Sequence, residues 1–237
     1  MKRQQGFTLI EIAIVLVIIG LLLGGVLKGQ ELITSARVRN LISTQDGIKA
    51  AYFGFLDRYR ALPGDYTQAT NNITGVAAIA ACGNGNGNGN GNGRIEAANQ
   101  ENVLAWEHIS KAGFINGTYT CGATENPPGG VLTTPVNPYG VRMQLIYDGA
   151  YGIAGAGAAR HNLKTGSQIP VEIITEVDRK IDDGAPYTGG FQFSAYDAGT
   201  GNPPTEGAPG TCTNGAAVSS IWLATNGFTN CGGTSTF

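Results

Sequence analysis

The chain begins with a short basic segment followed by a long apolar one. Residues 1–6 include a lysine and an arginine, and residues 7–27 are apolar except for Thr8, Glu11 and the glycines. A helix of this length rises about 31 Å, close to the thickness of a bilayer core. The pattern predicts a membrane-spanning helix whose start lies in the cytoplasm by the positive-inside rule.

The helical periodicity continues beyond Lys28 and ends before Pro63. Apolar residues recur along one face at helical spacing, at Leu41, Ile48, Tyr52, Phe55, Tyr59 and Leu62. The opposite face is polar, with Arg39, Asp46, Lys49 and Asp57. An amphipathic helix must bury its apolar face, and a β-sheet is a natural partner for it. We therefore expect one helix over residues 7–62 that ends against a sheet.

Shorter patterns in residues 63–237 predict a head domain of mixed structure. The expected helices are 101–112 and 169–182, and the expected strands are 141–147, 150–154, 191–196 and 219–224. Asp148-Gly149 predicts a hairpin between the first two strands. Residues 199–217, which are rich in Gly, Pro and Thr, predict a loop. Together these elements predict an α+β fold with an antiparallel sheet.

Composition narrows the class of protein. Charged residues make up 14% of the chain, against roughly 25% in soluble domains. The net charge is −2, so the sequence does not predict a nucleic-acid partner. His108 and His161 lie in no metal or nucleophile motif, and the sequence contains no Gly-x-Ser-x-Gly or phosphate-binding motif. We therefore do not expect an enzyme.

Glu11 is the informative residue of the apolar segment. A carboxylate costs roughly 2.5–3.5 kcal/mol at the centre of a membrane helix. Cleavage between Gly6 and Phe7 would create an α-ammonium at Phe7, four residues before this acid. In a packed array, the amine of one subunit could neutralise Glu11 of its neighbour. The alternative is an ordinary secretory signal peptide, which is disfavoured by the segment's length, by the lack of an Ala-x-Ala site and by the acid itself.

Gly6-Phe7-Thr8-Leu9-Ile10-Glu11 and the apolar run after it resemble the prepilin cleavage and methylation segment of type IV pilins and type II secretion pseudopilins. By this resemblance, a prepilin peptidase cleaves after Gly6 and methylates the nitrogen of Phe7, and Glu11 serves assembly. The resemblance implies a pilin-like fold with three parts. These are a leader at 1–6, a membrane and assembly helix at 7–62, and a globular head at 63–237.

The resemblance also implies a location, partners and a function. The precursor would cross the bacterial inner membrane once, with its head in the periplasm, and then join an extracellular pilus or a periplasmic pseudopilus. Its partners would be itself, other pilins, the prepilin peptidase and the inner-membrane assembly platform. The implied function is a structural filament subunit. A minor or tip pilin that binds a surface, or a type II secretion pseudopilin, is the alternative.

Many major pilins carry a proline in this first helix, whereas the first proline here is Pro63. Glycines at positions 20, 24, 25 and 29 stand in its place. Glycine lowers helix stability by about 1 kcal/mol, so local melting on assembly is left open. The departure favours a minor pilin or a pseudopilin slightly.

The four cysteines suggest two disulfides, because their number is even and export places them outside the cytosol. They are Cys82, Cys121, Cys212 and Cys231, and none forms a Cys-x-x-Cys pair. Three pairings are possible. We favour Cys82–Cys121 and Cys212–Cys231, because local pairs need no assumption about distant loops. Four reduced, buried cysteines are the alternative. The loop between Cys212 and Cys231 also resembles the disulfide-bounded C-terminal region of many pilins.

Residues 83–93, which alternate Gly and Asn, suggest either a flexible loop or a weak calcium site. The candidate ligands are the side chains of Asn88, Asn90 and Asn92 and the carbonyl of Arg94. They stand at EF-hand spacing, but the side chains are neutral amides, and position twelve is Asn99 instead of Glu.

Asp178, Asp182 and Asp183 form a second candidate calcium site. Like charges one helical turn apart repel, and acids oppose the dipole at the C-terminal end of a helix. A cation should therefore compensate them. Arg179, Lys180 or a basic residue from elsewhere in the chain is the simpler compensating group, and bound calcium is the alternative. We expect no other cofactor.

Overall fold

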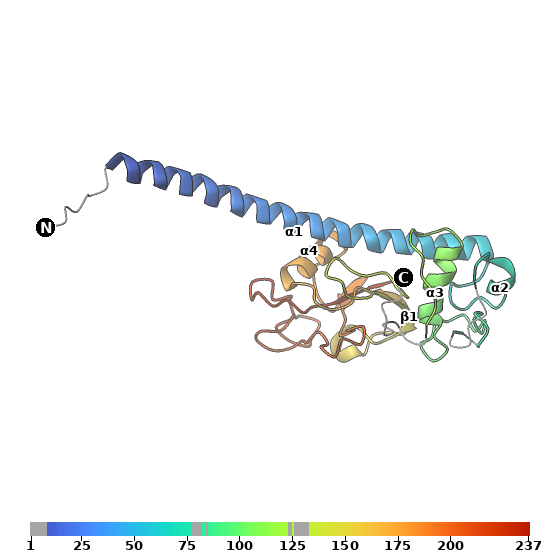
Figure 1. Cartoon of the computed structure of the whole chain (residues 1–237). Helices are drawn as coiled ribbons and strands as arrows, with labels where there is room; N and C mark the ends of the chain where they lie inside the picture. Colours follow the sequence, from blue (N-terminus) through green and yellow to red (C-terminus); the bar gives the residue numbers. More distant parts are fainter. Residues whose placement is uncertain (1–8, 77–81, 84, 123–124, 126–132) are drawn as a thin grey trace. The chain divides into compact units, whose positions relative to one another are not determined.

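The structure of the chain is a computed structural model that describes residues 9–76, 82–83, 85–122, 125 and 133–237 (Figure 1). Its contacts divide the chain into two units, one ending at Arg37 and the other comprising Val38–Phe237. The helix α1 (Leu9–Tyr59) contributes to both. It ends before Pro63, as expected, but at Tyr59 and not at residue 62, because Arg60 adopts a left-handed conformation with φ of +53°.

The second unit is an α+β head built on a four-stranded antiparallel sheet. The strands are β1 (Gln144–Asp148), β2 (Arg160–Lys164), β3 (Phe191–Phe193) and β4 (Gly233–Thr236). Their order is β1-β2-β4-β3, so the C-terminal strand lies inside the sheet. Ser235 of β4 is opposite Leu163 of β2 on one side and Phe191 of β3 on the other.

The other helices of the head are α2 (Ala69–Asn72), α3 (Glu101–Lys111) and α4 (Val171–Ile181), with a short 3-10 helix η1 (Ile153–Gly155). The positions of α3 and α4 confirm the two helices expected from the sequence. The helix α4 begins after Pro170, which occupies the N-cap position with an extended backbone. The expected strands at 141–147 and 191–196 are confirmed as the shorter β1 and β3.

The apolar face of α1 is buried in two clusters, as its periodicity predicts. The first cluster includes Ile48, Tyr52 and Phe55 of α1, Trp106 and Ile109 of α3, and Leu145 and Leu163 of the sheet. The second includes Val38 and Leu41 of α1, Ile174 and Val177 of α4, and Phe191 and Phe193 of β3. Each such side chain contributes roughly 1.5–3 kcal/mol by leaving water. The part of α1 beyond Arg37 is therefore an integral element of the head.

Gln45 is the buried polar residue on the same face of α1. Its Oε1 accepts a hydrogen bond from the hydroxyl of Ser235 in β4. Because both residues are buried, this bond satisfies two polar groups that water does not reach. It joins α1 to an inner strand of the sheet.

The expected hairpin at Asp148-Gly149 is wrong, because residues 150–154 do not form its second strand. The partner of β1 is β2, which begins at Arg160. Gly152 and Ala154 have φ values of +73° and +50°, which a strand does not accommodate. Apart from Tyr151 and Ile153, the segment between β1 and β2 consists of glycine and alanine, which are poor strand formers, whereas Leu163 of β2 is fully buried.

The strand expected at 219–224 is also wrong. An isolated bridge joins Trp222 to Thr213, and no ladder extends from it among the described residues. The strand β4, which the sequence did not predict, occupies the end of the chain. Its Gly-Thr-Ser-Thr sequence resembles an exposed turn, but Thr234 and Ser235 are fully buried because strands flank them on both sides.

Two neighbouring phenylalanines of α1 test the orientation of the helix in the head. Phe55 is 0% exposed and contacts four aromatic rings, whereas Phe53 is 51% exposed. We expect Phe55→Ala to lower the free energy of unfolding by about 3–5 kcal/mol, as for other buried aromatic truncations. The matched variant Phe53→Ala should cost less than about half as much. Denaturant unfolding of the full chain in detergent measures both, and equal losses would contradict the orientation.

Candidate functional site

The first part of α1 presents apolar side chains in every direction. Residues 9–27 are all exposed, although leucine, isoleucine and valine predominate among them. A helix that is apolar all round requires an apolar environment, which can be a membrane or a set of packed helices. The helix α1 is long and apolar enough to cross a membrane.

Glu11 lies in the first turn of α1 and is exposed. It is the one charged residue in the sequence of residues 9–27. The N-terminal end of a helix carries a partial positive charge, so this position suits an acid. The predicted cleavage residues, Gly6 and Phe7, lie outside the described residues, and the cut between them stays a prediction.

Two disulfides join Cys82 to Cys121 and Cys212 to Cys231, with Cα–Cα distances of 6.0 and 5.6 Å. These are the two local pairs that the sequence favours. The first packs with Val103 and Leu104 of α3 in a small buried cluster.

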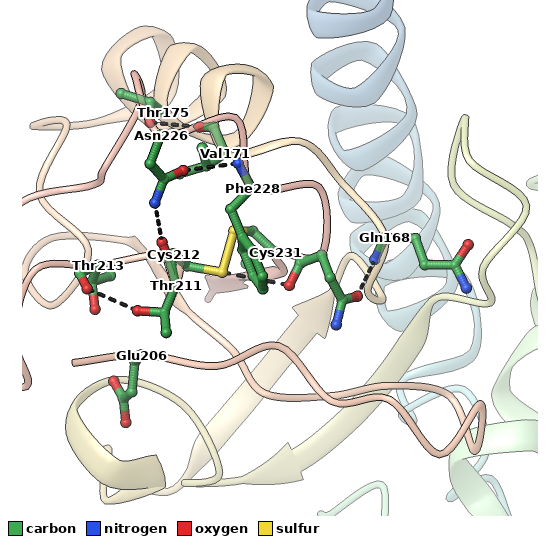
Figure 2. The surroundings of a disulfide bond; sticks show 12 residues. Gln168, Val171, Thr175, Glu206, Thr211, Cys212, Thr213, Asn226, Phe228 and Cys231 are labelled. Carbon is green, nitrogen blue, oxygen red and sulfur yellow. Dashed lines mark hydrogen bonds between the residues drawn. A yellow bond between two sulfur atoms is a disulfide. The ribbon is translucent and has the colours of Figure 1, made fainter. Parts of the chain in front are cut away.

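The second disulfide holds the C-terminal loop against the start of α4 (Figure 2). The side chain of Asn226 accepts the N–H of Phe228 at 2.8 Å and donates to the carbonyl of Thr211 at 2.7 Å. The backbone N–H of Val171 donates to the carbonyl of Phe228 at 2.8 Å. The loop between the two cysteines is thereby fixed to the first turn of α4.

The described part of the Gly/Asn repeat folds around the carboxylate of Asp65. This carboxylate accepts the backbone N–H groups of Gly91, Asn92 and Gly93 at 2.5, 3.1 and 2.8 Å. A Cβ on Gly89 would lie 2.2 Å from the backbone of Asp65, so the close approach requires glycine. The repeat therefore provides a nest of amides for a buried acid, a role that the sequence analysis did not identify.

The candidate calcium ligands in this repeat are engaged in local hydrogen bonds. The Oδ1 atoms of Asn90 and Asn92 accept the N–H groups two residues further along, both at 2.9 Å. Asn88 Oδ1 accepts the N–H of Thr70 at 2.9 Å. These bonds account for the asparagines without a metal. Calcium binding by Asn88, Asn90, Asn92 and the carbonyl of Arg94 stays a prediction.

The second predicted calcium site is brought together at the end of α4. Ligand oxygens of Asp178, Asp182 and Asp183 all lie within 4.8 Å of one another. Burial, followed by the negative charges of the other two acids, raises the pKa of Asp178 to about 7, although a hydrogen bond from Trp222 opposes this shift.

A half-buried polar layer covers one face of β1 and β2, and no sequence pattern predicted it. Glu125 accepts hydrogen bonds from the Tyr196 hydroxyl at 2.6 Å and from the Gln144 amide at 2.8 Å. Lys164 forms an ion pair with Asp148 at 2.5 Å. Burial, together with the adjacent Glu125, raises the pKa of Tyr196. These groups form hydrogen bonds and an ion pair with one another, and this arrangement indicates a structural role.

Residues 1–27 match the family model described as the prokaryotic N-terminal methylation motif. The chain carries the signature of type IV pilins and pseudopilins. This pilin signature implies a structural protein that a prepilin peptidase processes and that assembles with other pilins. Together with the apolar helix, it fits a membrane-anchored precursor in bacteria. The chain matches no curated protein and no solved structure.

His108 is a buried packing residue of the pilin-like head. Its Nδ1 accepts the N–H of Gly64 at 3.0 Å, so Nε2 carries the proton and donates to the carbonyl of Gly87 at 3.1 Å. The ring therefore joins the turn after α1 to the Gly/Asn repeat. Burial lowers the pKa of His108 to about 4, although the bond to Gly87 opposes this shift.

The pKa of His108 predicts a loss of stability in mild acid. An unfolded histidine has a pKa of about 6.5, so the unfolded state binds more protons than the folded state between pH 6.5 and 4. Lowering the pH from 7 to 4 should therefore remove about 3 kcal/mol of folding free energy through this group. The variant His108→Gln cannot titrate there, so the stability difference between the two proteins should narrow over this window. Denaturant unfolding at a series of pH values measures the free energy of unfolding of both proteins. If the two free energies fall in parallel from pH 7 to 4, His108 does not cause the loss of stability.

Proposed function

We propose that the chain is a structural subunit of a type IV pilus or pilus-like filament. A prepilin peptidase removes residues 1–6, and the subunit then assembles through α1. The observation that carries this proposal is the methylation motif at the start of a helix whose residues 9–27 are apolar on every side. Such a surface is unstable in water, and both a bilayer and a bundle of identical helices provide an apolar environment for it.

Electrostatics gives the assembly its register. Cleavage creates an ammonium group at Phe7, about one helical turn before Glu11. When two copies pack with a stagger of one turn, the amine of one meets the carboxylate of the other. Opposite charges 4 Å apart attract with about 4 kcal/mol at an effective dielectric constant of 20. Apolar surroundings strengthen this attraction, and pairing offsets much of the cost of leaving either charge alone in a helical core.

The head suits the outer surface of such a filament. Its two disulfides and the core shared with α1 hold together a domain rich in glycine loops. From Val38 onward α1 belongs to the head core, so the helix that would pack in a filament and the head are one folded chain without a linker between them.

A minor or tip pilin, or a type II secretion pseudopilin, is the second candidate. The absence of a proline before Pro63 favours it, because many major pilins have one in this helix. Subunit abundance separates these roles. Filaments composed mostly of this chain would indicate a major pilin, and a few copies per filament would indicate a minor or tip subunit.

Neutralising Glu11 should strongly reduce assembly without unfolding the head. The variant Glu11→Gln keeps the size of the side chain but cannot pair with an amine. We expect at least about a tenfold fall in filaments recovered by shearing, which corresponds to a loss of about 1.4 kcal/mol per contact. Equal amounts of subunit in the membrane fraction would show that synthesis and insertion are unchanged.

Glu31→Gln is the matched control on the same helix. Glu31 lies beyond the apolar segment, is exposed and pairs with Lys28 at 2.8 Å. The variant Glu31→Gln should assemble at the wild-type level, because exposed ion pairs contribute little to stability. If Glu11→Gln and Glu31→Gln both assemble normally, the proposed pairing is wrong.

A further inference from the structure

Three acids meet where α4 ends. Asp178 occupies the last turn of the helix, and Asp182 and Asp183 follow directly after it. Their ligand oxygens lie within 4.8 Å of one another. The C-terminal end of a helix carries a partial negative charge, so the dipole adds to the repulsion among the three carboxylates.

Asp178 provides an independent sign that a ligand belongs here. The residue is 0% exposed. Its Oδ2 accepts the indole N–H of Trp222 at 2.6 Å, and the N–H of Gly184 lies near the carboxylate. Its Oδ1 nevertheless has no hydrogen bond of good geometry among the described residues. Buried carboxylate oxygens normally have a donor or a cation beside them.

The basic residues nearby do not supply that cation. Arg179 and Lys180 lie in the same turn of α4 but are exposed. Lys180 pairs with Glu176, one turn back, at 3.9 Å. Within the described chain, neither basic side chain forms an ion pair with the three acids. The simpler compensation expected from the sequence is therefore absent from this arrangement.

The loop before β3 orients the two outer acids. Asp182 Oδ2 accepts the N–H groups of Gly190 and Phe191, the latter at 3.1 Å. Asp183 accepts the N–H of Ala185 at 2.9 Å and the hydroxyl of Thr188. These bonds fix both side chains and use both lone pairs of Asp182 Oδ2. Asp182 Oδ1 and one lone pair on each Asp183 oxygen are not used by these bonds and can face a metal.

We infer that Asp178, Asp182 and Asp183 form a calcium site that joins the end of α4 to the loop before β3. Calcium prefers hard oxygen ligands and accepts six to eight of them in flexible geometry, so backbone carbonyls or water would complete the shell. Magnesium requires a stricter octahedral geometry and loses its water reluctantly, so we expect this cluster to bind magnesium more weakly than calcium. This inference does not depend on the proposed filament role.

The site also reaches the C-terminal disulfide loop. Trp222 lies between Cys212 and Cys231 and donates to Asp178. A cation on Asp178 would therefore stabilise the contact between α4 and this loop as well as the loop before β3. Trp222 is one of two tryptophans in the chain, and the variant Trp106→Phe would make the fluorescence a local signal for binding.

Calcium titration of the full chain tests the inference. The protein, purified in detergent and treated with EDTA, is titrated with CaCl₂ up to about 10 mM, which covers the affinities of extracellular calcium modules. At a hundredfold excess over the Kd, we expect the Tm to rise by about 5–10 °C, together with a change in tryptophan fluorescence. MgCl₂ at matched ionic strength should produce a smaller rise.

Variants locate the binding. Asp183 is exposed, so Asp183→Asn should fold and yet bind calcium at least about tenfold more weakly, since a formal charge is lost from the ligand set. Asp178→Asn keeps an oxygen for Trp222 and should show a similar loss. Glu172→Gln, an exposed acid in the first turn of the same helix, is the control and should bind like the wild type.

Two results would overturn the inference. One is an unchanged Tm and fluorescence over the full calcium range. The other is an equal Tm rise in Asp183→Asn and Glu172→Gln, which would place any calcium at another position, such as the Gly/Asn repeat.

Discussion

A carboxylate in an apolar helix costs free energy unless a positive charge meets it, and Glu11 sets this constraint near the start of α1. A filament in which the amine of each subunit meets the acid of the next satisfies the constraint for every interior copy. The same contact specifies a stagger between helices, which apolar packing alone specifies poorly because leucine and isoleucine surfaces fit in many registers. In the proposed function, the charge pair provides the register and the apolar surface provides most of the affinity.

The second half of α1 is part of the core of the head. Val38, Leu41, Ile48 and Phe55 are buried along one face, and Gln45 joins that face to β4. The two disulfides and the amide nest around Asp65 hold loops that have few apolar residues of their own. The structure therefore depends on covalent and polar constraints where its hydrophobic core is thin.

The sequence predicts the elements whose signal lies in nearby residues, such as a helical periodicity or a short motif. The period of α1, the ends of α3 and α4, and the methylation motif all depend on nearby residues, and each was found. The strand β4 could not be predicted, because its Thr and Ser residues are buried only by strands that are distant in sequence. The hairpin prediction failed for a related reason. Asp148-Gly149 is a local turn signal, but the pairing of β1 is decided by the core position of Leu163.

The candidate sites show the same division. Asp182 and Asp183 are neighbours in sequence and Asp178 lies one helical turn before them, so the proximity of the three acids could be predicted from the sequence. The hydrogen bond from Trp222 to Asp178 could not be predicted, because the two residues are distant in sequence. The Gly/Asn repeat resembled a metal loop because an EF-hand loop and an amide nest both need glycine at close approaches. The acid that organises it, Asp65, lies well outside the repeat in sequence.

Mass spectrometry of subunits taken from sheared filaments tests the central claim most directly. The account predicts a mature chain that begins at Phe7 with a methylated amine, because the charge on that amine is what Glu11 meets. Assembled subunits that retain residues 1–6 would contradict it, since their chain would bear no amine at position 7.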